Sequence, residues 1–209
     1  MRTFVSKLLE VGGPPLAAEE PRLADGQLSA GGPDVAALLR ERNGFYAFEG
    51  ALHVFPASST TEEIGLNDWN APNLWKMAYG TLAPDGPCFA EDVFGGQFVA
   101  LRDGVYQFDP ETGDLVQMAS NIDGWARAIL EDYELLTGYP LAHAWQQRFG
   151  AIRAGMRLLP KIPFVLGGEY VIDNLHALDK VKGMRWRGSI ATQLRDLPDG
   201  AEVKIDFVD

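Results

Sequence analysis

The feature that most constrains the fold is a run of short apolar segments separated by turns, between residues 88 and 118. Two of these segments flank Arg102-Asp103-Gly104, and an Asp-Gly pair in that position is a strong hairpin signal. A second turn over residues 109–114 leads into the last segment. Consecutive strands joined by such short turns pair antiparallel, so the stretch predicts a meander. The predicted strands are 88–94, 97–101, 105–108 and 115–118.

Helices are predicted on both sides of this meander along the chain. Asp34 is expected to cap a helix over 35–42 that ends at Asn43-Gly44. A second helix over 124–136, opened by Asn121 or Asp123, follows the last strand. The remaining predicted elements are strands at 45–48 and 52–55, helices at 67–79 and 140–149, an extended stretch at 158–168, a short segment at 174–178, a helix at 189–196 and a strand at 202–207.

No internal repeat is visible, and no linker divides the chain. We therefore predict one α+β domain over residues 1–209, with a mostly antiparallel twisted sheet and helices packed on one side. An irregular N-terminal segment at 1–33 and a C-terminal elaboration at 138–209 complete the prediction.

The composition is that of a globular protein with a substantial core, with 46% hydrophobic and 22% charged residues. The sequence contains no run of about 18 apolar residues, so it predicts no transmembrane helix. Its first ten residues are too soon interrupted by charge for the apolar part of a signal peptide. Cys88 is the single cysteine, so no intrachain disulfide can form. A reducing cytoplasm is the expected location.

The acidity of the chain is concentrated in its middle. Residues 44–142 hold 15 acidic and 3 basic side chains, in a chain whose net charge is −11. A negative field repels phosphate backbones and attracts basic partners, which argues against direct nucleic-acid binding. Acidity of this size is also typical of proteins that carboxylates merely keep soluble, so the charge alone is compatible with both interpretations.

The candidates for metal binding or nucleophilic chemistry are few. His53, His143 and His176 lie far apart in sequence, and none has a partner at metal-ligand spacing. His53, between Leu52 and Val54, is expected to face outward or to make one structural hydrogen bond. Cys88 is expected to be a small buried hydrophobe. We predict no metal and no cofactor.

The remaining motifs are also weak signals for catalysis. The glycine pairs at 95–96 and 167–168 lack the residues of a phosphate-binding loop, and 109–120 lacks the glycine and glutamate of a calcium loop. One enzymatic alternative stays open: Glu91, Asp92 and Asp114 could converge in a pocket with raised carboxyl pKa values. The basic cluster Lys180, Lys182, Arg185 and Arg187 is predicted to be a solvated face.

Three segments carry a recurring pattern in one order. The first is a helix that ends in Asn43-Gly44 and continues into strands up to Pro56. The second is Phe89-Ala-Glu-Asp-Val-Phe-Gly-Gly-Gln-Phe-Val-Ala-Leu101, followed by the hairpin Gly104-Val-Tyr-Gln-Phe-Asp-Pro-Glu-Thr-Gly113. The third is the helix from Trp125 to Leu136. Together, over roughly residues 30–137, they resemble the SUKH superfamily of Smi/Knr-like proteins.

From residue 138 onward the chain departs from the short form of that family. Its segment 163–175 is similar to the tail of two-part immunity proteins of type VI secretion systems. The resemblance implies binding without catalysis, because many bacterial members are immunity proteins that neutralise a toxin. It also implies that the family contributes no catalytic residues.

The leading hypothesis is therefore an immunity protein that binds a cognate, basic bacterial toxin, for example a nuclease. The alternative is a non-catalytic regulatory or scaffolding adaptor that binds a signalling partner. Under the alternative interpretation of the interface, Trp69 is core and the acidic side chains only solubilise. The predicted partner-binding residues are Glu62, Glu63, Asp68, Trp69, Glu91, Asp92, Asp103 and Asp109.

Overall fold

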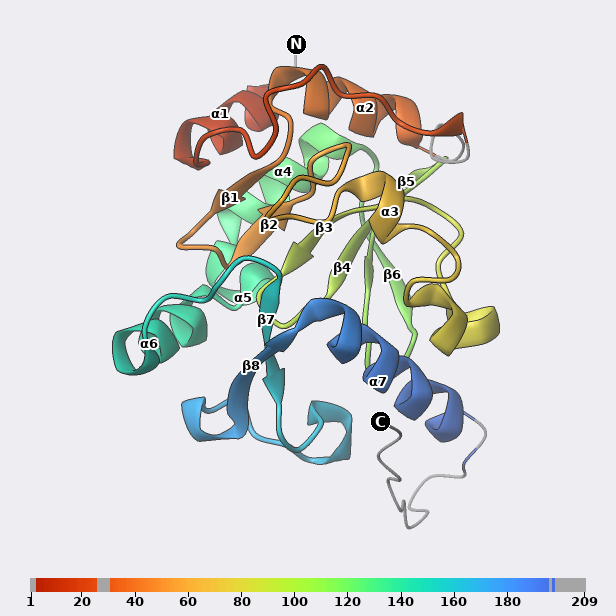
Figure 1. The fold of residues 1–209 in the computed structure, drawn as a ribbon, viewed down its shortest axis with the longest axis vertical. Coiled ribbons are helices and arrows are strands. Elements are labelled where there is room, and N and C mark those ends of the chain that lie inside the picture. The colour runs from red at the N-terminus through yellow and green to blue at the C-terminus, as the bar shows by residue number, and fades with distance from the viewer. Residues whose placement is uncertain (1–2, 26–30, 196, 198–209) are drawn as a thin grey trace.

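The protein is described here by a computed structural model that covers residues 3–25, 31–195 and 197. Within these residues, a six-stranded antiparallel sheet has the order β1-β2-β3-β4-β5-β6, so each strand pairs with the next along the chain (Figure 1). The predicted α+β class and antiparallel meander are confirmed. The strands are β1 (Phe45–Ala47), β2 (Leu52–Val54), β3 (Cys88–Asp92), β4 (Gln97–Leu101), β5 (Gly104–Phe108) and β6 (Leu115–Ala119).

Helices cover both faces of this sheet, whereas the sequence analysis predicted helices on one face only. Gln97 and Phe98 are neighbours in β4, so their side chains point to opposite faces. Phe98 packs against Trp125 of α4 (Ile122–Glu131), with ring centroids 5.6 Å apart. Gln97 instead accepts a 2.8 Å hydrogen bond from Trp69 of α3 (Leu66–Trp69). Strand residues are therefore buried on both sides, which matters for the polar ones described below.

The N-terminal segment is irregular over residues 12–25, as predicted, but residues 3–11 are helical where the sequence predicted no helix. Helix α1 (Thr3–Val11) packs on α4, and α2 (Gly32–Glu41) follows it at the same end of the molecule. The carboxylate of Asp123 accepts hydrogen bonds from the backbone amides of Phe4 and Val5, at the start of α1. Arg42 donates to the carbonyls of Leu9, Gly12 and Gly13 at its end. Both ends of α1 are thus satisfied by distant side chains.

Two predicted helices are divided in the structure. The stretch 67–79 forms α3 and the 3₁₀ segment η2 (Lys76–Leu82), because Pro72 offers no amide to continue a helix. The stretch 124–136 forms α4 and then α5 (Tyr133–Thr137). Asn121 caps α4 by accepting from the amide of Gly124, as one of the two predicted alternatives. Gly31, and not Asp34, occupies the cap position of α2.

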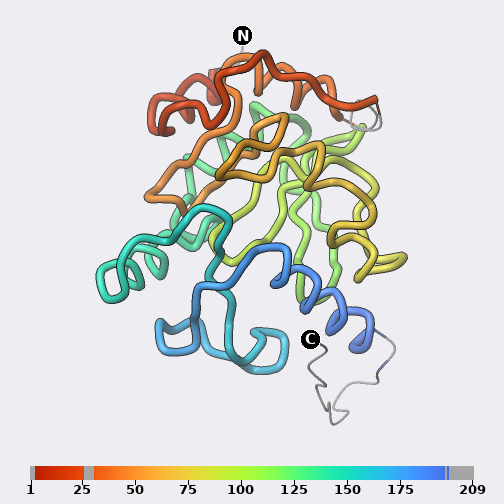
Figure 2. Tube along the Cα trace, viewed as in Figure 1, coloured from red at the N-terminus to blue at the C-terminus, as the bar shows by residue number. Residues whose placement is uncertain are grey.

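The C-terminal part folds back onto the lower end of the sheet in the view of Figures 1 and 2. Helix α6 (Tyr139–Phe149) leads to a separate hairpin of β7 (Met156–Pro160) and β8 (Leu175–Asp179). Two 3₁₀ turns, η3 (Phe164–Leu166) and η4 (Ile172–Asn174), lie between these strands. The last helix, α7 (Lys180–Leu194), begins well before the predicted Ser189 and packs on η2. The predicted strand 202–207 lies outside the described residues.

The core contains three fully buried tryptophans, Trp69, Trp75 and Trp125. A chain of ring contacts runs from Phe55 through Trp69 and Trp75 to Tyr79 on one face of the sheet. Cys88 is buried in β3, where burial raises the pKa of its thiol to about 11, as expected for a small core residue. None of the helices within the described ranges is long and apolar enough to cross a membrane.

Candidate functional site

The structure separates the eight predicted partner-binding residues into two groups. Four side chains are exposed: those of Glu62, Asp68, Asp103 and Asp109. Glu63, Trp69, Glu91 and Asp92 are buried, which corrects their assignment to a surface. The exposed four do not form one patch, because Asp103 and Asp109 lie beyond opposite ends of β5. The predicted set as a whole is therefore not a contact surface.

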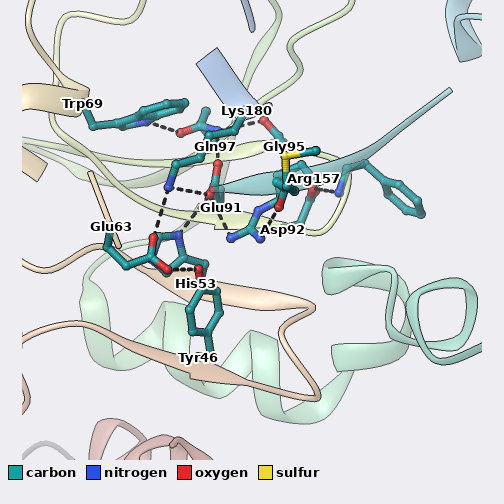
Figure 3. A network of polar contacts seen from close by, with 12 residues as sticks. Tyr46, His53, Glu63, Trp69, Glu91, Asp92, Gly95, Gln97, Arg157 and Lys180 are labelled. Carbon is teal, nitrogen blue, oxygen red and sulfur yellow. Dashed lines mark hydrogen bonds and ion pairs between the residues drawn. The ribbon is translucent and has the colours of Figure 1, made fainter. Parts of the chain in front are cut away.

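Two of the buried four, Glu63 and Glu91, belong to an ionic cluster between the sheet and the C-terminal part (Figure 3). Glu91 Oε1 lies 3.0 Å from His53 Nδ1, 2.8 Å from Arg157 Nη2 and 3.5 Å from Lys180 Nζ. Lys180 Nζ also lies 3.6 Å from Glu63 Oε2, and Glu63 Oε1 accepts a 2.5 Å hydrogen bond from Tyr46. Arg157 comes from β7 and Lys180 from α7, so the cluster joins distant segments of the chain.

The charges of the cluster balance when His53 is neutral. Glu63 and Glu91 face Arg157 and Lys180, whose ammonium also lies 4.6 Å from the ring centroid of Phe55. Burial, supported by the neighbouring cations, lowers the pKa of His53 to about 3. Burial opposes ionisation of Glu91, yet Arg157 and Lys180 hold its pKa well below the usual range. The histidine therefore donates from Nδ1 to a carboxylate as a neutral ring.

This cluster is a structural feature and not a binding site for a substrate. Side chains of His53, Glu63, Glu91, Arg157 and Lys180 are all at most 4% exposed. None of them lines either of the two surface hollows described below. His53 was predicted to face outward or to make one structural hydrogen bond; the first alternative is wrong, because both faces of the sheet are covered. The predicted solvated basic face is also wrong for Lys180 and Arg187, which are buried, while Lys182 and Arg185 are exposed.

An acidic cleft of about 520 Å³ lies at the end of the sheet nearest the C-terminal part. The β3–β4 and β5–β6 turns meet there, because turns that follow alternate strands of a meander share one end. The loop around η3 and the side chain of Arg187 from α7 close the other sides. A second hollow of about 480 Å³ adjoins it and shares Glu111, Asp114 and Val165. The carboxylates that line the cleft are Asp92, Asp109, Glu111 and Asp114.

Two of these carboxyls are buried at the wall of the cleft. Asp92 Oδ1 accepts 2.8 Å hydrogen bonds from the amides of Phe94 and Gly96, and burial raises the pKa of Asp92 to about 7. Glu111 is 4% exposed; its Oε2 accepts from the amide of Val165, and burial also raises its pKa. Among the described residues, Glu111 Oε1 has no hydrogen-bond partner. A buried carboxylate oxygen without a donor is a position that a cation would stabilise.

Arg187 is the cation that lines this cleft, and it is already engaged. Its Nη1 donates a 2.5 Å hydrogen bond to the carbonyl of Phe94. Gly95, with a φ of 81°, allows this approach, because a side chain there would collide with the guanidinium. Gly95 therefore serves the geometry of the β3–β4 turn and the packing of Arg187 against it.

The structure satisfies only part of the enzymatic hypothesis that the sequence left open, in which Glu91, Asp92 and Asp114 converge in a pocket. Asp92 and Asp114 line the same cleft, and the pKa of Asp92 is raised, as that hypothesis required. Glu91 does not join them, because it is held in the ionic cluster with a lowered pKa. Glu111, which sequence reasoning did not single out, takes the third place. Its position in a turn, next to Pro110, gave no local signal of burial.

The rim of the cleft is apolar and aromatic. Tyr170 is 62% exposed, and one face of its ring stacks on Phe164 with centroids 3.8 Å apart. Phe94 contacts both rings edge-on, which fixes the pair. Val116 of β6, an edge strand of the sheet, and Val165 are exposed and line the same cleft, while the exposed Leu115 lines the adjoining hollow. Apolar side chains gathered at an edge strand beside carboxylates are typical of a contact surface.

Within the described part of the chain, no group of three or more His, Cys, Asp or Glu residues could hold a metal ion. His143 bonds to Glu49 and His53 to Glu91, while His176 lies apart in β8.

Comparison with known proteins supports the fold and leaves the function open. No known protein family matches the sequence, and no curated protein matches it. The crystal structure of Atu4351 from Agrobacterium tumefaciens is similar, with a TM-score of 0.51 and 15% sequence identity. The similarity covers 87% of this chain and 86% of that one. At this identity the likeness extends to the fold alone.

Proposed function

We propose that the chain is an immunity protein that binds a basic bacterial toxin domain and neutralises it. The observation that carries the proposal is the surface at the cleft, where Val116, Val165 and Tyr170 are exposed beside Asp109 and Asp114. An apolar centre with a charged rim is the usual composition of a protein–protein interface. The resemblance of residues 30–137 to the SUKH superfamily supplies the class of partner.

The distribution of charge supports a basic partner. The cleft and its rim carry four carboxyl groups, of which Asp109 and Asp114 are exposed, while the one arginine lining the cleft is buried and bonded to a backbone carbonyl. A basic surface on the partner would gain from this arrangement in both steering and contact. Trp69 and Glu91 take no part, since both lie in the core.

The proposal is tested by co-expressing the chain with the product of the adjacent upstream gene. We expect the two proteins to co-purify, and growth to be restored in cells that express that product. Asp114→Lys should weaken binding about tenfold or more, because it places a like charge against a basic partner. Glu134→Lys, a charge reversal at another exposed residue, on α5, is the matched control and should leave the affinity unchanged.

Absence of both binding and protection would contradict the immunity proposal. The adaptor alternative would then be favoured, and a pull-down from the native host would identify its signalling partner. Binding without protection would also favour an adaptor. Equal loss of affinity in Asp114→Lys and Glu134→Lys would show that the interface lies outside the cleft.

A further inference from the structure

We infer that the cleft between the β5–β6 turn and the η3 loop is the binding site for an arginine side chain from a partner protein. The inference names the contact that the proposed function leaves open, and it rests on that function only for the identity of the partner. It is carried by three features of the cleft: an unpartnered carboxylate oxygen, a half-exposed aromatic face and an excess of negative charge.

Glu111 points to a cationic occupant. Its Oε2 accepts from the amide of Val165, and the neighbouring amide of Phe164 also helps to lower the pKa of the carboxyl, whereas Oε1 has no hydrogen-bond partner among the described residues although the side chain is 4% exposed. Asp114, on the same turn, is exposed at the mouth of the cleft. A donor entering between them would satisfy a buried acceptor and contact a second carboxylate. An anionic occupant such as a phosphate would be repelled by the same groups.

Tyr170 favours arginine over lysine. One face of its ring is stacked on Phe164 at an interplanar angle of 6°, and the side chain as a whole is 62% exposed. A planar guanidinium can stack on such a ring while its edge donates to carboxylates, which a compact ammonium cannot do. The nearby carboxylates of Glu111, Asp109 and Asp92 raise the pKa of Tyr170 in addition to its partial burial, so they lie within electrostatic reach of the ring.

The cation balance of the surroundings leaves room for one more positive charge. Arg187 acts on Glu111 through its charge, which opposes the rise in the pKa of this carboxyl, but it donates to the carbonyl of Phe94 and makes no hydrogen bond to Glu111 Oε1. Arg195 lines the adjoining hollow and not the cleft itself. Apolar side chains of Val116 and Val165 flank the opening and would cover the aliphatic stem of the incoming arginine.

A peptide titration tests this arginine-binding site in the absence of the partner protein. The probe is a capped Gly-Gly-Arg-Gly-Gly peptide added to the ¹⁵N-labelled full chain, followed by amide chemical shifts. We expect saturable shifts centred on Val165, whose amide bonds to Glu111, and on the residues around Tyr170. Peptides with citrulline or lysine in place of arginine separate charge from shape: the neutral citrulline peptide should produce no shifts, and the lysine peptide should bind at least several-fold more weakly.

Variants then locate the contact. Asp114→Asn combined with Tyr170→Ala changes two exposed side chains, so the fold should persist, and it should reduce arginine-peptide binding at least tenfold. Glu134→Gln combined with Leu135→Ala, two exposed changes on α5, should have no effect. Absence of shifts at millimolar arginine peptide, equal shifts with citrulline, or shifts away from the cleft would overturn the inference.

The partner measurement distinguishes failure here from failure of the proposed function. If the toxin binds equally well to wild type and to the Asp114→Asn/Tyr170→Ala variant, the inferred arginine-binding site is wrong and the proposed immunity function stands. If the arginine peptide binds in the cleft and the adjacent gene product does not bind, the arginine-binding site is supported and the proposed partner is wrong.

Discussion

Replacing Glu91 by glutamine is expected to lower the free energy of unfolding by about 3–5 kcal/mol. The substitution preserves shape but removes the charge that His53, Arg157 and Lys180 share within 3.5 Å. Both cations would remain buried with Glu63 as the one carboxylate left to the cluster. Chemical denaturation followed by tryptophan fluorescence measures the change, since three tryptophans are buried in the core.

Glu62→Gln is the matched control for this experiment. Glu62 is exposed, so its substitution should change stability by less than about 0.5 kcal/mol. The double variant Glu91→Gln/Arg157→Met should be less destabilised than the sum of the two single variants, because it removes an ion pair and not one partner. A loss below about 1 kcal/mol for Glu91→Gln would show that water reaches the cluster and screens its charges.

Acidification should destabilise the protein through His53, by an amount on the order of 4 kcal/mol between pH 6.5 and about pH 3. The unfolded chain binds a proton on His53 below its ordinary pKa of 6.5, whereas the folded protein does so only near pH 3. Stability contributed by the neutral ring is therefore present above pH 6.5 and lost as the pH falls. Glu91, whose pKa lies well below its ordinary 4.5, adds to the loss below that pH.

Asp92 opposes this trend over part of the range. Its pKa is raised from 3.8 to about 7, so the folded state binds the extra proton and gains stability as the pH falls from 7 toward 4. The free energy of unfolding should consequently fall most steeply with pH below about pH 4. Denaturation midpoints measured from pH 8 to pH 3 would show this curvature.

The variant His53→Asn identifies the residue responsible. Asparagine can present an amide donor near the position of Nδ1, and it does not titrate in this range. Without the titration of His53, the effect of Asp92 is left unopposed, so the free energy of unfolding should rise as the pH falls from 6.5 to 4, whatever the variant loses in absolute stability. An unchanged slope would assign the acid sensitivity to other groups.

Local sequence signals were sufficient for the meander and insufficient for its surroundings. The Asp-Gly pair at 103–104 and the turn at 109–114 predicted β4, β5 and β6 almost to their observed bounds. Helix α1 was missed although Phe4, Val5, Leu8 and Leu9 follow helical spacing, and the residues that hold its ends, Asp123 and Arg42, are distant in sequence.

The candidate site was predictable only in outline. The acidity of the middle segment is a property of the sequence, but burial decides which carboxylates a partner could reach. Glu91 and Asp92 are adjacent in one strand, yet Glu91 lies in an ion pair network and Asp92 at a cleft. Cations from Arg157 and Lys180 and the aromatic rim from Phe164 and Tyr170 reach these carboxylates only through the tertiary fold.

The order of the sheet has a consequence for how the chain is assembled during synthesis. Strands β1 to β6 pair strictly in sequence, so the whole sheet can form before the C-terminal part has left the ribosome. Arg157 and Lys180 emerge later, which leaves Glu63 and Glu91 hydrated until the C-terminal hairpin docks. Removal of water from the cluster then becomes a late step of folding. Substitutions of its two cationic residues should therefore chiefly accelerate unfolding.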